Sequence, residues 1–176
     1  MKLHVHQSGA TKDYSQGLGW MNFVRLHSFT YLAAMLTAHK FDTVMIIDDN
    51  AIDCFIHSKL LKLLRFSTKE LVYNNCFSAL KYLYDHQHEA SELPNLILLD
   101  WSMPLMDGLE FLAEYHQLPQ AVQSHCRIVV LSSFAELDHI VQFNEAALVW
   151  RVLEKPLRRQ DLEELALSFH PIQQTC

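Results

Sequence analysis

Long apolar runs and clusters of basic residues are both missing from this chain of 176 residues. The longest apolar run near the N-terminus, residues 31–36, is far shorter than a helix that crosses a bilayer. Lysine and arginine number 14 against 20 acidic residues, the net charge is −6, and the basic residues are scattered. Such a chain gains little from approaching a nucleic-acid backbone. We therefore expect a globular protein whose partner is neither a membrane nor a nucleic acid.

Paired cysteines are also missing. Cys54, Cys76, Cys126 and Cys176 are widely spaced, and no Cys-x-x-Cys motif occurs. This spacing does not fit a zinc site or a disulfide framework, so we expect free thiols in a reducing compartment, which means a cytoplasmic location. The eleven histidines likewise include no pair at convincing metal-ligand spacing.

Glycine is scarce and unevenly distributed: the chain has four, and three of them lie in the first 20 residues. This shift in composition separates an N-terminal extension, residues 1–40, from a regular domain over residues 41–170 and a short tail over residues 171–176. Within the extension, residues 22–38 carry apolar side chains at helical spacing. A short helix, a poorly ordered segment and a chain start at a later methionine all remain open for the extension.

Strand and helix patterns alternate five times from residue 41 onward. Short apolar runs typical of buried strands cover residues 43–47, 70–73, 95–99, 127–131 and 149–153. Helical patterns follow them over residues 52–63, 78–86, 109–115, 136–143 and 161–169. In the first of these helices the apolar repeat consists of Ile52, Phe55, Ile56, Leu60 and Leu63. The alternation predicts an α/β fold, with a parallel sheet covered by helices on both faces.

Polar residues gather where four of the five predicted strands end. Asp48 and Asp49 follow the first strand, and Asp100 follows the third. Ser132 follows the fourth, and Lys155 comes just after the fifth. The carboxyl ends of parallel strands meet at one edge of a sheet, so we expect these side chains to lie close together. Three carboxylates would repel one another without a cation, and oxygen ligands favour Mg²⁺. An ammonium and a hydroxyl suit phosphoryl oxygens, so the pattern predicts phosphoryl transfer to a carboxylate.

Plainer and competing interpretations exist for these residues. A single acid after a strand is often a solvated loop residue or a helix N-cap, and Ser132 could cap the helix that follows it. A phosphatase of the haloacid-dehalogenase type also uses an aspartate nucleophile after a strand, but it needs a second acid two residues later, where Ser102 stands. A flavodoxin-like cofactor site would need a phosphate-binding loop after the first strand, where Asp48 and Asp49 would repel a phosphate.

Four segments resemble the signature blocks of response-regulator receiver domains: residues 46–50, 99–108, 130–133 and 153–157. The resemblance covers roughly residues 41–169, and the block around Asp100 is the most specific. It implies a flavodoxin-like, doubly wound sheet of five parallel strands in the order 2-1-3-4-5, with five helices.

The resemblance implies a role for each acidic residue of the cluster. Asp100 corresponds to the nucleophile that accepts the phosphoryl group. Asp48, Asp49 and Asp100, together with the backbone carbonyl of Ser102, correspond to the ligands of a Mg²⁺ ion.

The resemblance also implies the groups that bind the phosphoryl oxygens. Ser132 corresponds to a residue that donates a hydrogen bond to one oxygen, and Lys155 to a residue that pairs with another. The peptide between Lys155 and Pro156 corresponds to a cis bond. Val152 departs from the family pattern, because many members carry an aromatic residue there.

The partners implied by the resemblance are proteins. The phosphoryl donor would be a phosphohistidine on a sensor histidine kinase or a histidine phosphotransfer protein. The chain would then be no enzyme in the ordinary sense, since it would catalyse only its own phosphorylation and dephosphorylation. We expect a stand-alone receiver with no DNA-binding output domain, whose output is a protein-interaction face formed by the fourth helix, fifth strand and fifth helix. A pseudo-receiver that serves only as a scaffold is the alternative.

Overall fold

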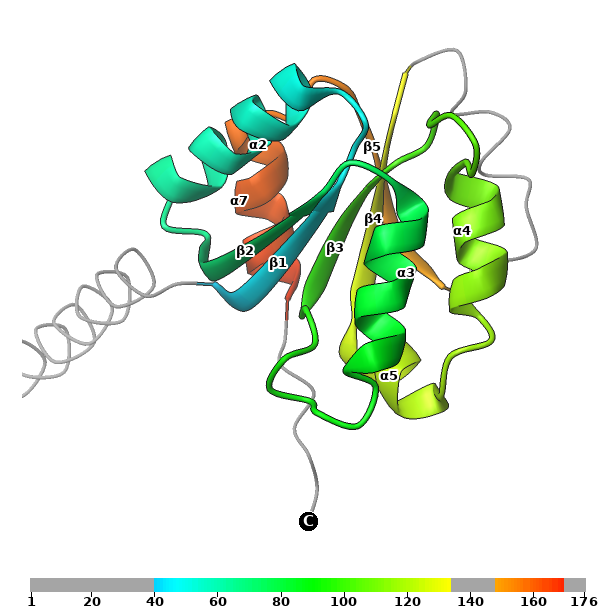
Figure 1. Ribbon diagram of the computed structural model, residues 1–176. Helices are drawn as coiled ribbons and strands as arrows, with labels where there is room; N and C mark the ends of the chain where they lie inside the picture. Colours follow the sequence, from blue (N-terminus) through cyan, green and yellow to red (C-terminus); the bar gives the residue numbers. More distant parts are fainter. Residues whose placement is uncertain (1–39, 134–147, 170–176) are drawn as a thin grey trace, which may run out of the picture. The chain divides into compact units, whose positions relative to one another are not determined.

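One parallel sheet organises the protein, and the computed structural model describes it over residues 40–133 and 148–169 (Figure 1). Five strands lie in the order β2-β1-β3-β4-β5, and every neighbouring pair is parallel. The strands are β1 (Phe41–Ile47), β2 (Ser67–Tyr73), β3 (Leu96–Asp100), β4 (Arg127–Ser132) and β5 (Val149–Glu154). This order confirms the predicted doubly wound topology, in which the winding reverses between β1 and β3.

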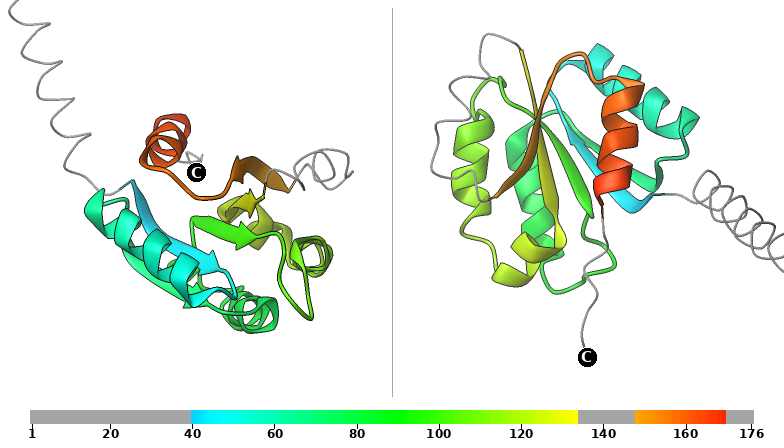
Figure 2. Two further views of the ribbon diagram at one scale, coloured as in Figure 1. Left: turned by 90° about the horizontal axis from the view of Figure 1, so that it is seen from above. Right: turned by 180° about the vertical axis from the view of Figure 1, so that it is seen from behind.

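Helices cover both faces of the sheet. The described ranges contain α2 (Ala51–Leu63), α3 (Cys76–Asp85), α4 (Gly108–Tyr115), α5 (Gln120–His125) and α7 (Arg159–Ser168). Helices α2 and α7 lie on one side, and α3, α4 and α5 lie on the other (Figures 1 and 2). Among these described helices, none is long and apolar enough to cross a membrane. The predicted helices over residues 22–38 and 136–143, and the predicted tail, lie outside the described residues.

The two central strands are buried on both faces. In β1 and β3, alternate side chains enter opposite layers of the core, because successive residues of a strand point to opposite sides. One layer contains Met45, Ile47, Ile97 and Leu99. The other contains Val44, Ile46, Leu96 and Leu98. All eight side chains are fully buried, which explains why these segments appear in the sequence as unbroken apolar runs.

Helix α2 packs on the sheet through the side that is poorer in large apolar residues. Its buried residues are Cys54, His57 and Leu61. The apolar repeat of the sequence correctly predicts a helix, but four of its five members point outward: Ile52, Phe55, Ile56 and Leu63 are 45–77% exposed. The helix begins after Asn50, which caps it by accepting a hydrogen bond from the backbone nitrogen of Ile52 at 3.0 Å.

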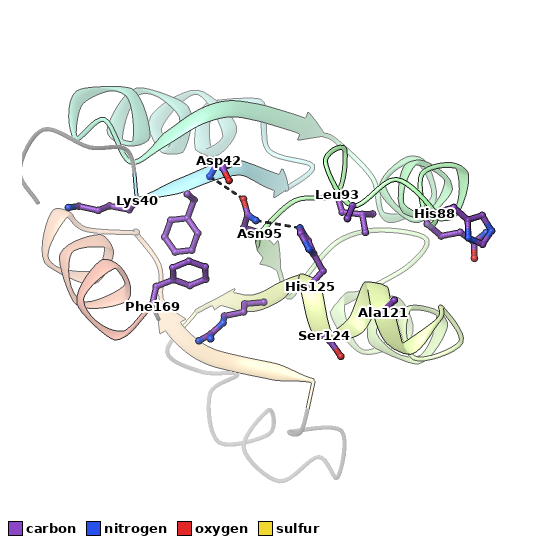
Figure 3. A pocket seen from close by; sticks show the side chains of 13 residues that line it. Lys40, Asp42, His88, Leu93, Asn95, Ala121, Ser124, His125 and Phe169 are labelled. Carbon is purple, nitrogen blue, oxygen red and sulfur yellow. Dashed lines mark hydrogen bonds between the residues drawn. The ribbon is translucent and has the colours of Figure 1, made fainter. Parts of the chain in front are cut away.

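A hollow of about 740 Å³ lies at the amino ends of the strands (Figure 3). Beside it, the Oδ1 atom of Asn95 accepts hydrogen bonds from the backbone nitrogens of Asp42 at 3.1 Å and Thr43 at 3.0 Å. The amide nitrogen of Asn95 therefore faces Nε2 of His125, at 3.4 Å. These contacts join the loop before β3 to the start of β1 and to the end of α5. The hollow lies at the edge of the sheet opposite to the predicted acidic cluster.

The opposite exposure of two leucines on α2 provides a matched test. Leu61→Ala is expected to lower the free energy of unfolding by about 2–5 kcal/mol, because Leu61 is fully buried and its removal leaves a cavity. Leu63→Ala is expected to change it by less than about 0.5 kcal/mol, because Leu63 is 77% exposed. Urea unfolding followed by circular dichroism measures both changes. Equal losses in the two variants would contradict the orientation of α2.

Candidate functional site

The structure brings together the polar residues that follow the strands. Asp48 and Asp49 come directly after β1, and Asp100 is the last residue of β3. Oxygen atoms of these three carboxylates all lie within 4.8 Å of one another. The parallel arrangement of the strands accounts for this meeting of residues that are about fifty positions apart in the sequence. The predicted acidic cluster therefore exists at the carboxyl edge of the sheet.

Burial makes it energetically costly for the carboxylates of this cluster to carry negative charge. Asp48 is 1% exposed and Asp100 is 6% exposed, whereas Asp49 faces solvent. Burial raises the pKa of Asp100 above its ordinary value, because a desolvated carboxylate is costly, and the negative charge of Asp48 adds to the rise. The hydrogen bond and the charge of Lys155 act in the opposite direction without cancelling it. The cluster thus requires positive charge close to Asp100.

Lys155 supplies positive charge from the loop after β5. Its Nζ atom lies 2.9 Å from Oδ2 of Asp48 and 2.9 Å from Oδ2 of Asp100. Burial lowers the pKa of Lys155, but its hydrogen bonds to Asp48 and Asp100 raise that pKa by more, so the pKa lies above the ordinary value. The side chain is therefore a charged ammonium at neutral pH.

A backbone contact between two loops positions Lys155. The backbone nitrogen of Lys155 donates a hydrogen bond to the carbonyl oxygen of Ser132, the last residue of β4, at 2.8 Å. The peptide between Lys155 and Pro156 is cis, as the resemblance implied. Ser132 is 1% exposed and lies at the same edge of the sheet, so the structure places Ser132 and Lys155 together as the sequence predicted.

The loop after Asp100 is folded back by a tryptophan that packs on a glycine. The backbone nitrogen of Gly108 donates to the carbonyl oxygen of Trp101 at 2.9 Å. A Cβ atom at residue 108 would lie 2.6 Å from Cε3 of Trp101, so any other residue there would displace the indole. The backbone nitrogen of Ser102 lies 3.4 Å from Oδ1 of Asp100 and donates to it. Asp107 is the N-cap of α4 and forms a capping box with Glu110, so the role of Asp107 is structural.

A third acidic partner of Lys155 is absent from the sequence prediction. Oδ2 of Asp53, in the first turn of α2, lies 3.5 Å from the Nζ atom of Lys155. An acidic residue in the first turn of a helix is common in its own right, so the sequence holds no signal that sets Asp53 apart as a partner of Lys155. Val152, which departs from the family pattern, is partly buried and packs against the core layer of α3 and α4.

The donor set has the chemistry of a divalent-cation site. Asp48, Asp49 and Asp100 offer hard oxygen ligands, the kind that Mg²⁺ prefers. Among the residues that the structure describes, this is the one group of three or more acidic, histidine or cysteine side chains close enough to share an ion. An ammonium beside the same oxygens completes a place where a phosphate-like anion could be bound and its charge balanced.

Comparison with known sequences gives consistent matches. The sequence model of the response regulator receiver domain matches residues 44–167. The response regulator Rcp1 of Synechocystis sp. is 28% identical over 99 residues, which are 56% of this chain and 66% of that protein. Sporulation initiation phosphotransferase F of Bacillus subtilis is 26% identical over 81 residues, 46% of this chain and 61% of that protein. The matches thus cover just under two thirds of these relatives' own lengths.

Comparison with solved structures agrees. A response regulator receiver protein from Dyadobacter fermentans is 31% identical, with a TM-score of 0.61 over 70% of this chain and 93% of that one. A two component response regulator from Cytophaga hutchinsonii is 21% identical, with a TM-score of 0.66 over 74% of this chain and 100% of that one, a likeness of fold. Since the family match spans well over half of the sequence, the chain belongs to the response regulator receiver domain family.

Proposed function

We propose that the chain accepts a phosphoryl group on Asp100 from a phosphohistidine of a sensor histidine kinase or a histidine phosphotransfer protein. The observation that carries the proposal is the buried Asp100 carboxylate, held 2.9 Å from the Lys155 ammonium beside two further aspartates. A nucleophile, a cation and a set of metal ligands are the parts that phosphoryl transfer to a carboxylate requires.

The transfer is an in-line displacement at phosphorus. An oxygen of Asp100 attacks the phosphorus atom, and an O–P bond forms while the N–P bond of the phosphohistidine breaks. The electron pair of the broken bond stays on the ring nitrogen, which then binds a proton from solvent. The products are an acyl phosphate on Asp100 and a neutral histidine on the donor.

Mg²⁺ would be held by Asp48, Asp49, Asp100 and the backbone carbonyl of Ser102. When bound, the ion offsets the negative charge that gathers between the carboxylates and the phosphoryl oxygens. Support comes from the donor set itself, which consists of hard oxygens within 4.8 Å of one another.

Lys155 and Ser132 bind the transferred group. Lys155, now paired with Asp100, turns its ammonium to a phosphoryl oxygen once the acyl phosphate forms, and the Ser132 hydroxyl donates to another. The hydrogen bond from the Lys155 backbone to the Ser132 carbonyl keeps the two residues at a fixed spacing, which supports their joint role.

The phosphorylated chain signals through protein contacts. Phosphorylation shifts a pre-existing equilibrium of the face that includes β5 and α7, and a downstream protein reads the change. The remainder of that predicted face, residues 136–143, lies outside the described residues. A cytoplasmic location belongs to the same proposal and is supported by three buried free thiols, those of Cys54, Cys76 and Cys126.

A small phosphodonor tests the assignment of Asp100. Acetyl phosphate with Mg²⁺ is expected to add one phosphoryl group to the wild type and none to Asp100→Asn, because the amide is a poor nucleophile. Intact mass spectrometry measures the adduct. Asp107→Asn is the matched control, since it alters an aspartate that caps α4 and leaves the cluster intact. A wild type without an adduct at any Mg²⁺ concentration would favour a scaffold that keeps the fold alone.

Removal of the ammonium tests the charge balance. Lys155→Met is expected to lower the free energy of unfolding of the metal-free protein by about 2–4 kcal/mol at neutral pH, because it leaves Asp48 and Asp100 buried without their cation. The loss should shrink as the pH falls, because Asp100, whose pKa is already raised, becomes neutral on protonation. Mg²⁺ should restore more stability to this variant than to the wild type, by replacing the lost charge.

Urea unfolding with and without Mg²⁺ measures these differences. Lys81→Met is the control, because Lys81 forms an exposed ion pair with Asp85 and its removal should change stability by less than about 1 kcal/mol. An identical response to Mg²⁺ in Lys155→Met and the wild type would show that the ion and the ammonium do not share the same carboxylates.

A further inference from the structure

Lys155 contacts three carboxylates, and one of them has no part in the proposed chemistry. Asp48 and Asp100 lie 2.9 Å from its Nζ atom, and Asp53 lies 3.5 Å from it. Asp53 does not belong to the group whose oxygens lie within 4.8 Å of one another, which consists of Asp48, Asp49 and Asp100. Asp53 therefore contacts the ammonium without being one of the proposed metal ligands.

The local structure of α2 directs Asp53 toward Lys155. Oδ1 of Asn50 accepts a hydrogen bond from the backbone nitrogen of Ile52, which fixes the orientation of the Asn50 amide. Its Nδ2 atom therefore points along the helix and donates to Oδ2 of Asp53 at 3.2 Å. The N-terminal end of α2 also favours a negative side chain in its first turn. Asp53 is thus held in place before any phosphoryl group arrives.

Phosphorylation changes the other two partners of Lys155 but not Asp53. In the proposed function, Asp48 turns its oxygens to the metal ion, and one Asp100 oxygen becomes the bridging oxygen of an acyl phosphate. Both changes weaken the contacts that hold the ammonium in the resting state. Lysine has a long, flexible side chain, and an ammonium released by two partners would lose its fixed position. Of the three described carboxylate partners of Lys155, Asp53 is the one to which the proposed function assigns neither the metal ion nor the phosphoryl group.

We propose that Asp53 is a positioning residue, which keeps the Lys155 ammonium at the phosphoryl site while Asp48 and Asp100 are engaged elsewhere. The inference rests on the proposed function, since it assigns a role in the same transfer. Asp53 neither binds the phosphoryl group nor reacts with it; it acts through Lys155. The acceptor reaction should therefore depend on the charge of residue 53 only when residue 155 is a lysine.

A double-mutant cycle measures that dependence. At saturating Mg²⁺, Asp53→Asn is expected to lower the initial rate of phosphorylation by acetyl phosphate about three- to tenfold. Asp53→Glu, which restores the charge, should retain at least half of the wild-type rate. In a Lys155→Met background, Asp53→Asn should change the residual rate by less than about twofold. The Mg²⁺ concentration for half-maximal rate should stay within about twofold of the wild type, which separates positioning from metal affinity.

Glu154→Gln is the matched control. It removes a negative charge from the residue next to Lys155, yet Glu154 is exposed and forms no ion pair with Lys155 among the described contacts. Its rate should equal that of the wild type. A second readout avoids the low rates of Lys155→Met: in Mg²⁺-loaded protein with ¹⁵N-labelled lysine, proton exchange at the Lys155 ammonium should be faster in Asp53→Asn and unchanged in Glu154→Gln.

The outcomes separate this inference from the proposed function. A wild type that forms no adduct overturns the acceptor assignment. The role of Asp53 is overturned, and Asp100 stays the acceptor, if the wild type is phosphorylated and Asp53→Asn is equally fast. The same conclusion follows if Asp53→Asn slows the reaction by the same factor with Lys155 present and in the Lys155→Met background. An unchanged ammonium exchange in Asp53→Asn likewise contradicts the positioning role.

Discussion

The contact of one partly buried ammonium with two buried carboxylates is the constraint around which this fold is arranged. Lys155 and Asp48 are 107 positions apart in the sequence, yet their charged atoms lie 2.9 Å apart. Either carboxylate alone would be costly at such burial, and the ammonium offsets both. The strand order 2-1-3-4-5 places the ends of β1 and β3 side by side, and the bond between Ser132 and Lys155 brings in the loop after β5. The sheet thus keeps the charged groups of Lys155, Asp48 and Asp100 in contact, whereas in an unfolded chain each would be solvated by water.

The two edges of the sheet differ in the kind of polar side chain that they carry. At the amino edge, the neutral side chain of Asn95 satisfies two backbone nitrogens of β1, beside a hollow of about 740 Å³. At the carboxyl edge, the residues are charged and packed closely around Asp100. The hollow therefore does not coincide with the acidic cluster. In open α/β sheets, function collects where strands end in polar residues, because the loops there are free to vary while the apolar strands keep them in register.

Much of the site at the carboxyl edge could be predicted from the sequence, because Asp48, Asp100 and Ser132 each come at the end of a run of buried apolar residues. The contact between Asp53 and Lys155 could not be predicted, since the sequence of a helix does not show which distant loop will face it. The sequence also does not show which side of α2 packs on the sheet. Periodicity identifies a helix, but it does not identify the packed side when apolar residues lie on both sides. Two further elements, β2 and α5, have weak sequence patterns and form because of the elements beside them. The first half of β2, from Ser67, is polar and is held by pairing with β1, and the short α5 buries only Val122.

The packing of Trp101 against Gly108 has an optical consequence. Trp101 follows Asp100 directly in the chain, and its indole packs so closely on Gly108 that a side chain at residue 108 would displace it. Indole emission responds to charge in its surroundings, so under the proposed function a cation or a phosphoryl group bound at Asp100 would change the electric field around this indole. Trp150, in contrast, lies with its ring 4.8 Å from the guanidinium of Arg127 and belongs to the other layer of the core. If the proposed function holds, the emission of Trp101 would report occupancy of the site without any added label.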